Sequence, residues 1–189
     1  MPRLDNAIDI KAPADKVFAY VADVTSHPEW VKWTKRAEVT SLERKGVGST
    51  SAGLMQVGPR KEKIEDIVTE YKEGEFVTRR TTVGMEMTDR LSVLNMGDTT
   101  KVAWSVDYKP PMGSMGKLVD KLFMERLFDQ LMKDSLTNLK ERLETIYRDA
   151  FSFSCGPDGA GAWTATIELP FTRRAPGRSP RRTDRKSVV

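Results

Sequence analysis

Residues 113–148 read GSMGKLVDKLFMERLFDQLMKDSLTNLKERLETIYR and predict one long helix. In its second half, apolar residues recur every three or four positions, as in a helix that lays one face on a core. This stripe comprises Met132, Leu136, Leu139, Leu143 and Ile146. In the first half the apolar residues spread around most of the circumference, which is typical of a helix that is buried on several sides or lines an apolar space. They are Met115, Leu118, Val119, Leu122, Phe123, Met124, Leu127, Phe128 and Leu131.

The chain ahead of this helix is rich in predicted strands. Residues 7–10 form a first strand, and two short helices follow, with Pro13 and Pro28 in their first turns. Apolar residues then alternate with polar ones, and glycine-containing turns separate the runs, so we expect an antiparallel meander. Its strands are predicted at 37–43, 49–57, 61–71, 75–83, 85–95 and 99–109. The last strand alternates so regularly that one of its faces should be covered and the other wet.

Composition restricts the chemistry. The 189 residues fit one domain, and 39% hydrophobic with 31% charged residues describe a soluble globular protein. Apolar runs stay below the roughly 20 residues that span a bilayer, and the first residues lack an apolar signal core. We therefore expect a cytoplasmic protein.

Cys155 and His27 are the only cysteine and histidine, which disfavours a catalytic triad and a Cys/His metal site. We predict neither metal nor cofactor.

The net charge of +4 belongs to the C-terminal tail. Residues 150–189 hold seven Lys/Arg and three Asp/Glu, which accounts for all of it. Their Gly/Pro/Ser/Arg-rich composition predicts a disordered segment, whereas residues 1–149 form the folded domain. The arginines would attract phosphate nonspecifically, but no interleaved aromatics or recognition helix predict a specific nucleic-acid partner. The oligomeric state is left open by the sequence.

Several short motifs follow one another in a characteristic order. They are IKAPADKVF at 10–18, HPEW at 27–30, VGST at 47–50, TKVAW at 100–104, YKPPMG at 108–113 and LTNLKERLE at 136–144. With them, residues 1–149 resemble the START-like, or helix-grip, superfamily (SRPBCC proteins), in particular its polyketide cyclase/dehydrase type. The resemblance implies an α+β helix-grip fold, in which a curved antiparallel sheet of about seven strands wraps around a long C-terminal helix. It also implies a cavity between sheet and helix. Members include cyclases and lipid or hormone carriers, so the resemblance selects no activity.

Methionines gather where the last strands and the helix should meet, and methionine suits adaptable apolar pockets. We therefore predict a set of ligand contacts along these elements and the short helices. The set is Trp30, Trp33, Met87, Leu91, Trp104, Met112, Met115, Leu118, Leu122 and Arg126. Ordinary core packing explains the aromatic and apolar members equally well, and Arg126 is also compatible with a surface position.

Three residues are candidates for proton transfer. Glu125 extends the helical stripe forward and would have a raised pKa if it faced the interior; the alternative, which the sequence favours, is a solvated residue paired with Lys121. Asp89 is in register with Met87 and Leu91 on one strand. His27 precedes a short helix, where a capping or surface role is the alternative to a general base.

Three functions remain open on the sequence alone. The first is binding of a small hydrophobic or amphipathic molecule between sheet and helix. The second is a cyclase- or dehydrase-like enzyme acting on a bound carbonyl compound. The third is a non-enzymatic interaction module with a packed core, which the volume of the interior cavity would separate from the other two.

Overall fold

The structure is a computed structural model that describes residues 2–109 and 119–152. The order of its elements confirms the predicted helix-grip arrangement of strand, short helices, six strands and long helix. The elements are β1 (Arg3–Ile10), α1 (Ala14–Ala22), η1 (Val24–Ser26), α2 (His27–Trp30), β2 (Thr34–Val39), β3 (Thr50–Val57), β4 (Arg60–Lys72), β5 (Phe76–Val83), β6 (Met87–Asn95), β7 (Thr100–Tyr108) and α3 (Val119–Ser152). The part of the predicted helix at 113–118 lies outside the described residues.

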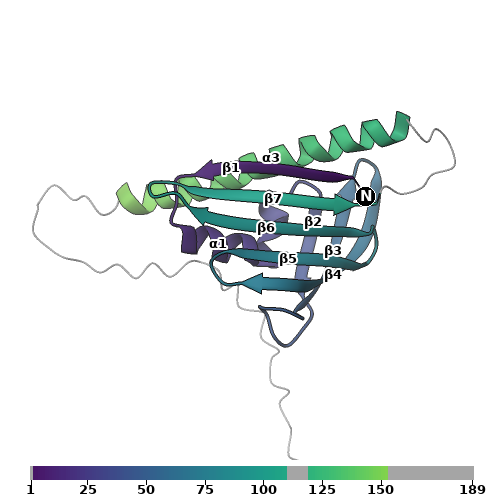
Figure 1. Cartoon of the computed structure of the whole chain (residues 1–189), viewed down its shortest axis with the longest axis horizontal. Helices are drawn as coiled ribbons and strands as arrows, with labels where there is room; N and C mark the ends of the chain where they lie inside the picture. The colour runs from purple at the N-terminus through teal and green to yellow at the C-terminus, as the bar shows by residue number, and fades with distance from the viewer. Residues whose placement is uncertain (1, 110–118, 153–189) are drawn as a thin grey trace, which may run out of the picture. The chain divides into compact units, whose positions relative to one another are not determined.

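The strands form one antiparallel sheet of seven in the order β1-β7-β6-β5-β4-β3-β2. Consecutive strands from β2 to β7 are neighbours in the sheet, as the short connections between them favour. β1 pairs with β7 and forms one edge of the sheet, and β2 forms the other (Figure 1). The pairing shifts register within β4, between Glu65 and Asp66 and again between Val68 and Glu70. Such bulges bend a strand and increase its twist, so they help the sheet to curl.

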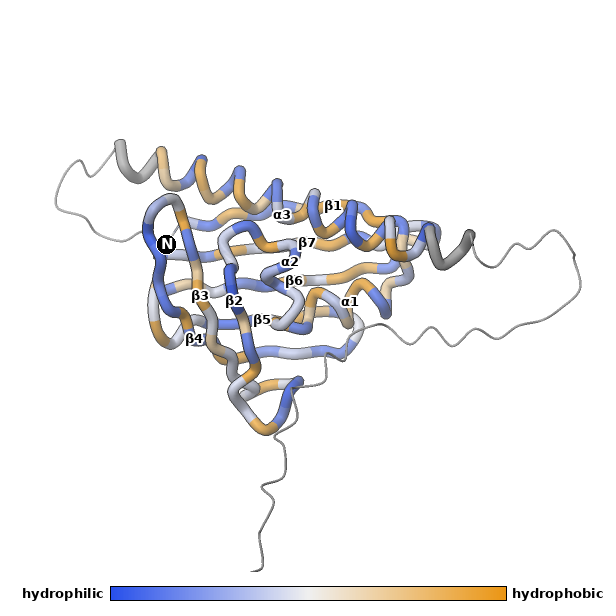
Figure 2. The backbone as a smooth tube through the Cα atoms, turned by 180° about the vertical axis from the view of Figure 1, so that it is seen from behind, coloured by the Kyte–Doolittle hydropathy of each residue, from blue (hydrophilic) through white to orange (hydrophobic). Residues whose placement is uncertain are grey.

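The helices cover one face of this sheet (Figures 1 and 2). Alternation on β7 decides which face: Val102, Trp104, Val106 and Tyr108 are buried, and the residues between them are half-buried. The same face of β6 presents Met87, Asp89, Leu91 and Val93. We call this surface the inner face. α1 packs over β6 and β5, whereas α3 runs along β1.

α3 lays its stripe on the core. Five of its side chains, spaced by three or four residues, are at most 2% exposed: Phe128, Met132, Leu136, Leu139 and Leu143. The predicted stripe was wrong at its end, because Ile146 is 38% exposed. The neighbouring Tyr147 packs against the core instead. β1 ends at Ile10, so the last turns of α3 pass beyond the strand that covers the stripe.

Polar contacts fix α3 on both of its sides. Toward β1, Asn6 Nδ2 donates to Asp129 Oδ1 at 3.0 Å, and Lys140 Nζ donates to the Asp9 carbonyl at 2.8 Å.

Toward α2, the buried Ser135 hydroxyl accepts from the Lys32 backbone N–H at 2.9 Å and donates to the Leu131 carbonyl at 2.6 Å. Arg142 forms an ion pair with Glu29. Contacts on both sides hold α3 in one orientation over the inner face.

Candidate ligand site on the inner face of the sheet

An aromatic cluster lies between the inner face and α3. Trp33 stacks on Trp104 with ring centroids 5.0 Å apart, and Trp30 contacts Trp104 edge-on at 5.4 Å. Phe128 of α3 lies over Tyr108 at 4.9 Å and reaches Trp33 at 5.8 Å. All five rings are buried. Sequence-predicted ligand contacts Trp30, Trp33 and Trp104 thus come together from α2, the loop after it and β7.

Two further predicted contacts lie on the same face. Met87 is 7% exposed and Leu91 is fully buried, both on β6. In the register, Met87 is opposite Tyr108, and Leu91 is opposite Trp104. The inner face of β6 and β7 therefore forms a continuous wall of apolar and aromatic side chains.

A buried ion pair interrupts this wall. Arg79 on β5 is directly opposite Asp89 on β6, and Arg79 Nη1 lies 3.5 Å from Asp89 Oδ2. The other guanidinium nitrogen, Nη2, donates to the carbonyls of Val21 at 3.3 Å and Ala22 at 2.8 Å. These carbonyls end α1, where the helix dipole favours a positive charge. Arg79 therefore ties the sheet to the end of α1.

Burial raises the pKa of Asp89 to about 6, against the opposing attraction of the Arg79 charge. The Asp66 carboxylate raises it further, while the nearby indole N–H of Trp104 lowers it. Burial also raises the pKa of Asp66, which accepts a hydrogen bond from Thr81 Oγ1 at 2.8 Å. Strands β4, β5 and β6 thus place two carboxylates near one guanidinium.

Three buried polar atoms of the inner face make no hydrogen bond within the described residues. They are Arg79 Nη1, Trp104 Nε1 and Tyr108 Oη. Arg79 Nη1, 3.5 Å from Asp89 Oδ2, and the Trp104 indole N–H both face the Asp89 carboxylate and stabilise its charge, although neither meets the geometry of a hydrogen bond. An unsatisfied buried polar group costs about 1–3 kcal/mol, and Tyr108 Oη, which does not share the Asp89 contact that Arg79 and Trp104 make, is the one that most needs an explanation. All three can donate a hydrogen bond.

His27 lies at the start of α2, and its Nε2 is 3.2 Å from the Val21 carbonyl. The ring is edge-on to Trp30, with centroids 5.3 Å apart. Burial and the Arg79 charge lower the pKa of His27 to about 3, so the imidazole is neutral near pH 7 and Nε2 is the donor. This placement favours a structural role in joining α1 to α2.

The helical candidates have different positions. Glu125 is half-buried, and its charge helps to raise the pKa of Tyr108 to about 12, although burial contributes more. Arg126 is exposed, as is Phe123 at 64%, so this turn of α3 is not buried all round. The side chain of Leu122 is not described. Met112, Met115 and Leu118 lie outside the described residues.

Sequence reasoning missed Arg79 and Tyr108 as members of the site. Alternation could have found Tyr108, because it continues the covered face of β7. Arg79 follows a buried Thr78 and precedes the exposed Arg80, so alternation within β5 does not single it out. Its signal is the cross-strand register with Asp89, which a single sequence does not supply.

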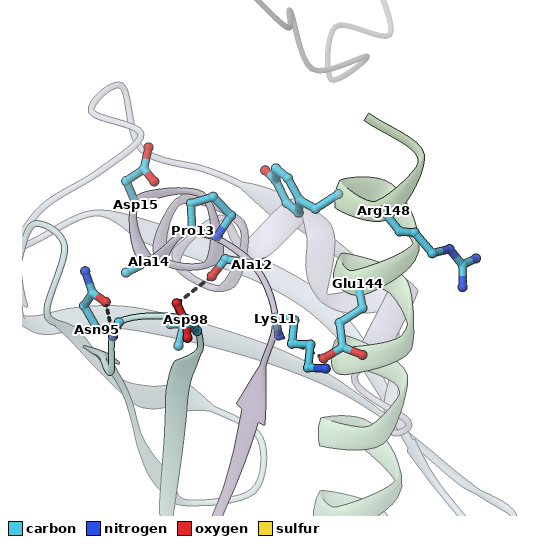
Figure 3. A pocket seen from close by; sticks show the side chains of 12 residues that line it. Lys11, Ala12, Pro13, Ala14, Asp15, Asn95, Asp98, Glu144 and Arg148 are labelled. Atoms are coloured by element: carbon cyan, nitrogen blue, oxygen red, sulfur yellow. Dashed lines mark hydrogen bonds between the residues drawn. The ribbon is translucent and has the colours of Figure 1, made fainter. Parts of the chain in front are cut away.

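A recess lies at the far end of α3, away from the inner face. It is an open groove of about 740 Å³ between the start of α1, the β6–β7 turn and the last turns of α3 (Figure 3). The Lys11 backbone N–H donates to Glu144 Oε1 at 2.8 Å, and Thr100 Oγ1 donates to the Ala12 carbonyl at 2.6 Å. These two hydrogen bonds give polar groups that line the groove partners within the protein itself. A smaller pocket of about 250 Å³ lies beside α2.

The described residues offer no group of three or more His, Cys, Asp or Glu side chains placed to hold a metal ion. Among the same residues, no helix combines the length and apolarity needed to cross a membrane.

A sequence-family profile now identifies the class. The family described as polyketide cyclase / dehydrase and lipid transport matches residues 1–144, and the chain belongs to it. A comparison with proteins of curated function finds no match.

Solved structures agree on the fold. TTHA0849 from Thermus thermophilus is 20% identical and has a TM-score of 0.66 over 77% of this chain and 99% of its own. The Zhui aromatase/cyclase from Streptomyces sp. R1128 is 14% identical, with a TM-score of 0.67 over 79% of this chain and 97% of its own. A START superfamily protein from Mycobacterium smegmatis is 16% identical, with a TM-score of 0.60 over 76% and 98%. Each is similar along nearly its whole length to the helix-grip domain described above.

Proposed function

We propose that the protein binds a small, largely apolar molecule between the inner face of the sheet and α3. One observation carries this proposal: three hydrogen-bonding atoms are buried without partners among the described residues, in a surface that is otherwise aromatic and apolar. Ligand sites have this composition, a mainly apolar lining with a few polar groups that fix orientation. Family membership supports the same function, since the family description includes lipid transport.

Phe128 is the side chain that a ligand must displace. Its ring covers Tyr108, and the three unpartnered atoms have almost no solvent-accessible surface. A ligand that reaches Tyr108 Oη therefore exchanges the contacts of Phe128 for its own. The flexible thioether of Met132, one helical turn further on and fully buried, gives this part of the core room to adapt.

Binding of a fluorescent polyaromatic dye to wild-type protein and to two variants tests the proposal. Phe128→Ala should bind the dye more tightly than the wild type, because the substitution removes the ring that competes for the site. The matched control is Phe123→Ala on the same helix, which removes an exposed ring and should leave affinity unchanged. Absence of saturable dye binding to wild type and Phe128→Ala would contradict the proposal and favour a packed interaction module.

A second candidate function rests on Asp89. A carboxylate with a pKa of about 6, beside a guanidinium and two other hydrogen-bond donors, is suited to remove a proton next to a carbonyl and to have the resulting enolate stabilised. This is the proton transfer that a cyclase- or dehydrase-like reaction needs.

Hydrogen–deuterium exchange tests this enzymatic function without knowledge of the natural substrate. The methyl protons of 2-acetylnaphthalene in D2O should exchange faster with wild-type protein than in buffer, as followed by NMR. Asp89→Asn should lose the acceleration. Asp98→Asn, a substitution in the groove of Figure 3, should retain it. Equal exchange with wild type and with buffer would exclude Asp89 as a base for this carbon acid.

A further inference from the structure

One end of the sheet gathers exposed apolar side chains. Each strand is antiparallel to its neighbours, so β1, β2, β4 and β6 run in the same direction and end at the same end of the sheet (Figure 1). The connections that follow these four strands therefore lie next to one another along that end. We call these connections, residues 11–13, 40–49, 73–75 and 96–99, the turn rim.

The last turns of α3 reach the same end, because the Lys11 backbone N–H donates to Glu144 Oε1. Seven large apolar side chains are exposed among the residues that the structure describes, and five of them lie at or beside the turn rim. These five are Leu42, Val47, Leu94, Met96 and Ile146. Their concentration at one end indicates a surface that contacts something apolar outside the chain.

The connection between β2 and β3 holds its apolar side chains in solvent with a defined backbone. Ser41 Oγ accepts from the Thr50 backbone N–H at 2.9 Å, and the Gly48 N–H donates to the Val68 carbonyl at 2.8 Å. Leu42, between these anchors, is fully exposed. A leucine held outside the core in this way forgoes the stabilisation that burial provides. Such a residue is expected where its apolar contact is made with a partner.

The spacing of the apolar side chains favours a soft partner over a rigid one. Leu42 and Val47 lie on one connection, Leu94 and Met96 lie around the turn after β6, and the charged connection 73–75 separates the two pairs. A stable protein interface buries about 800 Å² on each partner around a continuous apolar centre. A lipid surface needs no such continuity, because apolar side chains insert individually to the level where headgroups meet acyl chains.

The charges of the turn rim indicate which lipids fit. Its residues include three basic and four acidic side chains, so positive and negative charges nearly balance: Lys11, Arg44 and Lys45 against Glu43, Glu73, Glu75 and Asp98. Anionic lipids attract segments with an excess of lysine and arginine, which the rim lacks. A zwitterionic headgroup such as phosphocholine carries both charges and no net charge, and so complements the rim.

We propose that the turn rim docks the protein on a bilayer surface of zwitterionic lipid, with its apolar side chains inserted between the headgroups. The rim is separate from the inner face of the sheet, so this docking does not depend on the proposed binding function. A bilayer is also where small apolar molecules dissolve, and docking would bring the domain to that source.

Co-sedimentation of the full chain with phosphatidylcholine vesicles tests the proposal. Vesicles without net charge are essential, because the seven basic side chains of residues 150–189 would attract anionic lipid on their own. Wild type should bind, and added salt should not weaken the binding. The double variants Leu42→Ser with Val47→Ser and Leu94→Ser with Met96→Ser should each bind about tenfold more weakly, as expected when two partly inserted apolar side chains are replaced.

Val83→Ser is the matched control, because Val83 is also an exposed apolar residue but ends β5 at the opposite end of the sheet. It should bind vesicles as wild type does. Phosphatidylcholine brominated on its acyl chains should quench the added fluorescence of Leu42→Trp and leave that of Val83→Trp unchanged.

Three results would overturn the proposal: no binding of wild type to phosphatidylcholine, equal losses in Val83→Ser and the rim variants, or no quenching in Leu42→Trp. Analytical ultracentrifugation without vesicles adds a fourth. A wild-type dimer that Leu42→Ser with Val47→Ser converts to monomer would make the rim an interface between copies of the chain. The rim variants should bind the polyaromatic dye as wild type does, so failure of the docking proposal leaves the proposed function intact.

Discussion

Tyr108 is the residue at which the proposed binding function and the stability of the fold conflict. Its hydroxyl is fully buried, and no hydrogen-bond partner reaches it within the described residues. Desolvating a hydroxyl without a partner costs free energy of folding, so the fold tolerates Tyr108 rather than gaining from its hydroxyl. A residue of this kind is expected where the missing partner is a ligand.

The first prediction compares two hydroxyls. Tyr108→Phe removes one that makes no bond to the described residues, so the free energy of unfolding should rise by about 1 kcal/mol. Ser135→Ala removes one that bonds both Lys32 N and Leu131 O, and should lower it by about 1–2 kcal/mol. Urea denaturation monitored by circular dichroism measures both. A loss of stability in Tyr108→Phe would mean that its hydroxyl is hydrogen-bonded.

The second prediction concerns pH. The folded protein binds the Asp89 proton more tightly than the unfolded chain does, since the pKa rises from 3.8 to about 6. The stability associated with this proton is therefore fully present below pH 4 and is lost as the pH rises through 6. The wild type should lose up to about 3 kcal/mol relative to Asp89→Asn across this window. Urea denaturation of both proteins at several pH values measures the difference.

Asp129 supplies the control of opposite sign for that measurement. Hydrogen bonds from Asn6 and Lys133 lower its pKa, so its contribution is present above the unfolded pKa and is lost as the pH falls through the folded one. Relative to Asp129→Asn, the wild type should therefore gain stability as the pH rises from acid. Slopes of the same sign for both aspartates would contradict the assignment of Asp89.

Alternation along β6 and β7, readable from the sequence, is enough to place Met87, Leu91 and Trp104 on one covered face. The same reasoning puts Asp89 in that register, and its side chain is 16% exposed there. Two properties need the folded chain. The pairing of Arg79 with Asp89 depends on cross-strand register, and the lack of partners at Tyr108 among the described residues depends on every neighbouring atom.

At the scale of elements, the turn between β5 and β6 depends on close packing against β4. Gly84 has φ of +100°, and a Cβ atom at this position would lie 2.6 Å from the Lys63 carbonyl oxygen. Gly97 in the β6–β7 turn has a similar φ of +89°, but its Cβ would meet nothing within 4 Å among the described residues. Substitution of Gly97 therefore tests backbone strain alone, whereas substitution of Gly84 adds a steric clash to that strain.

The third prediction uses this pair. Gly97→Ala should lower the free energy of unfolding by about 1 kcal/mol, the penalty of a left-handed backbone conformation for alanine. Gly84→Ala should cost about 1–3 kcal/mol more, because β4 or the turn must also move to admit the methyl group. Thermal or urea unfolding of both variants measures the difference. Equal losses would show that the turn after β5 adapts freely.

The long helix was predictable in its pattern and less so in its surroundings. Spacing alone identified the buried stripe from Met132 to Leu143. It extended the stripe wrongly to Ile146, because helical periodicity continues after the sheet beneath it has ended. In the first half of the predicted helix, the apolar residues spread so widely around the axis that we expected burial on several sides, yet Phe123 is exposed. Periodicity reports which residues share a face, and the facing strand decides how much of that face is covered.

For the whole molecule, the ligand proposed for the inner face would contact both the sheet and α3, so binding should stabilise the domain as one unit. At a free ligand concentration one hundred times Kd, the stabilisation is about 2.7 kcal/mol. For a domain of this size, the thermal midpoint should rise by roughly 5–10 °C with saturating 2-acetylnaphthalene. Calorimetry of wild type and Phe128→Ala checks this fourth prediction. An unchanged midpoint in both proteins would contradict it.

The architecture as a whole followed from the order of elements in the sequence. Short turns between alternating runs imposed an antiparallel meander, and one long helix remained to cover its apolar face. The position of that helix did not follow in the same way. α3 is held along β1 by the bonds from Asn6 to Asp129 and from Lys140 to the Asp9 carbonyl, which join residues more than 120 positions apart.

The pairing of β1 with β7 has a consequence for synthesis on the ribosome. Arg3 is opposite Asp107 and Ile10 is opposite Thr100, so β1 is synthesised about 90 to 100 residues before its partner strand. At translation rates of about 5–20 residues per second, β1 waits roughly 5–20 s with its backbone donors and acceptors unpaired. Its exposed face carries Arg3, Asp5 and Asp9, charges that discourage pairing with a neighbouring nascent chain during this interval.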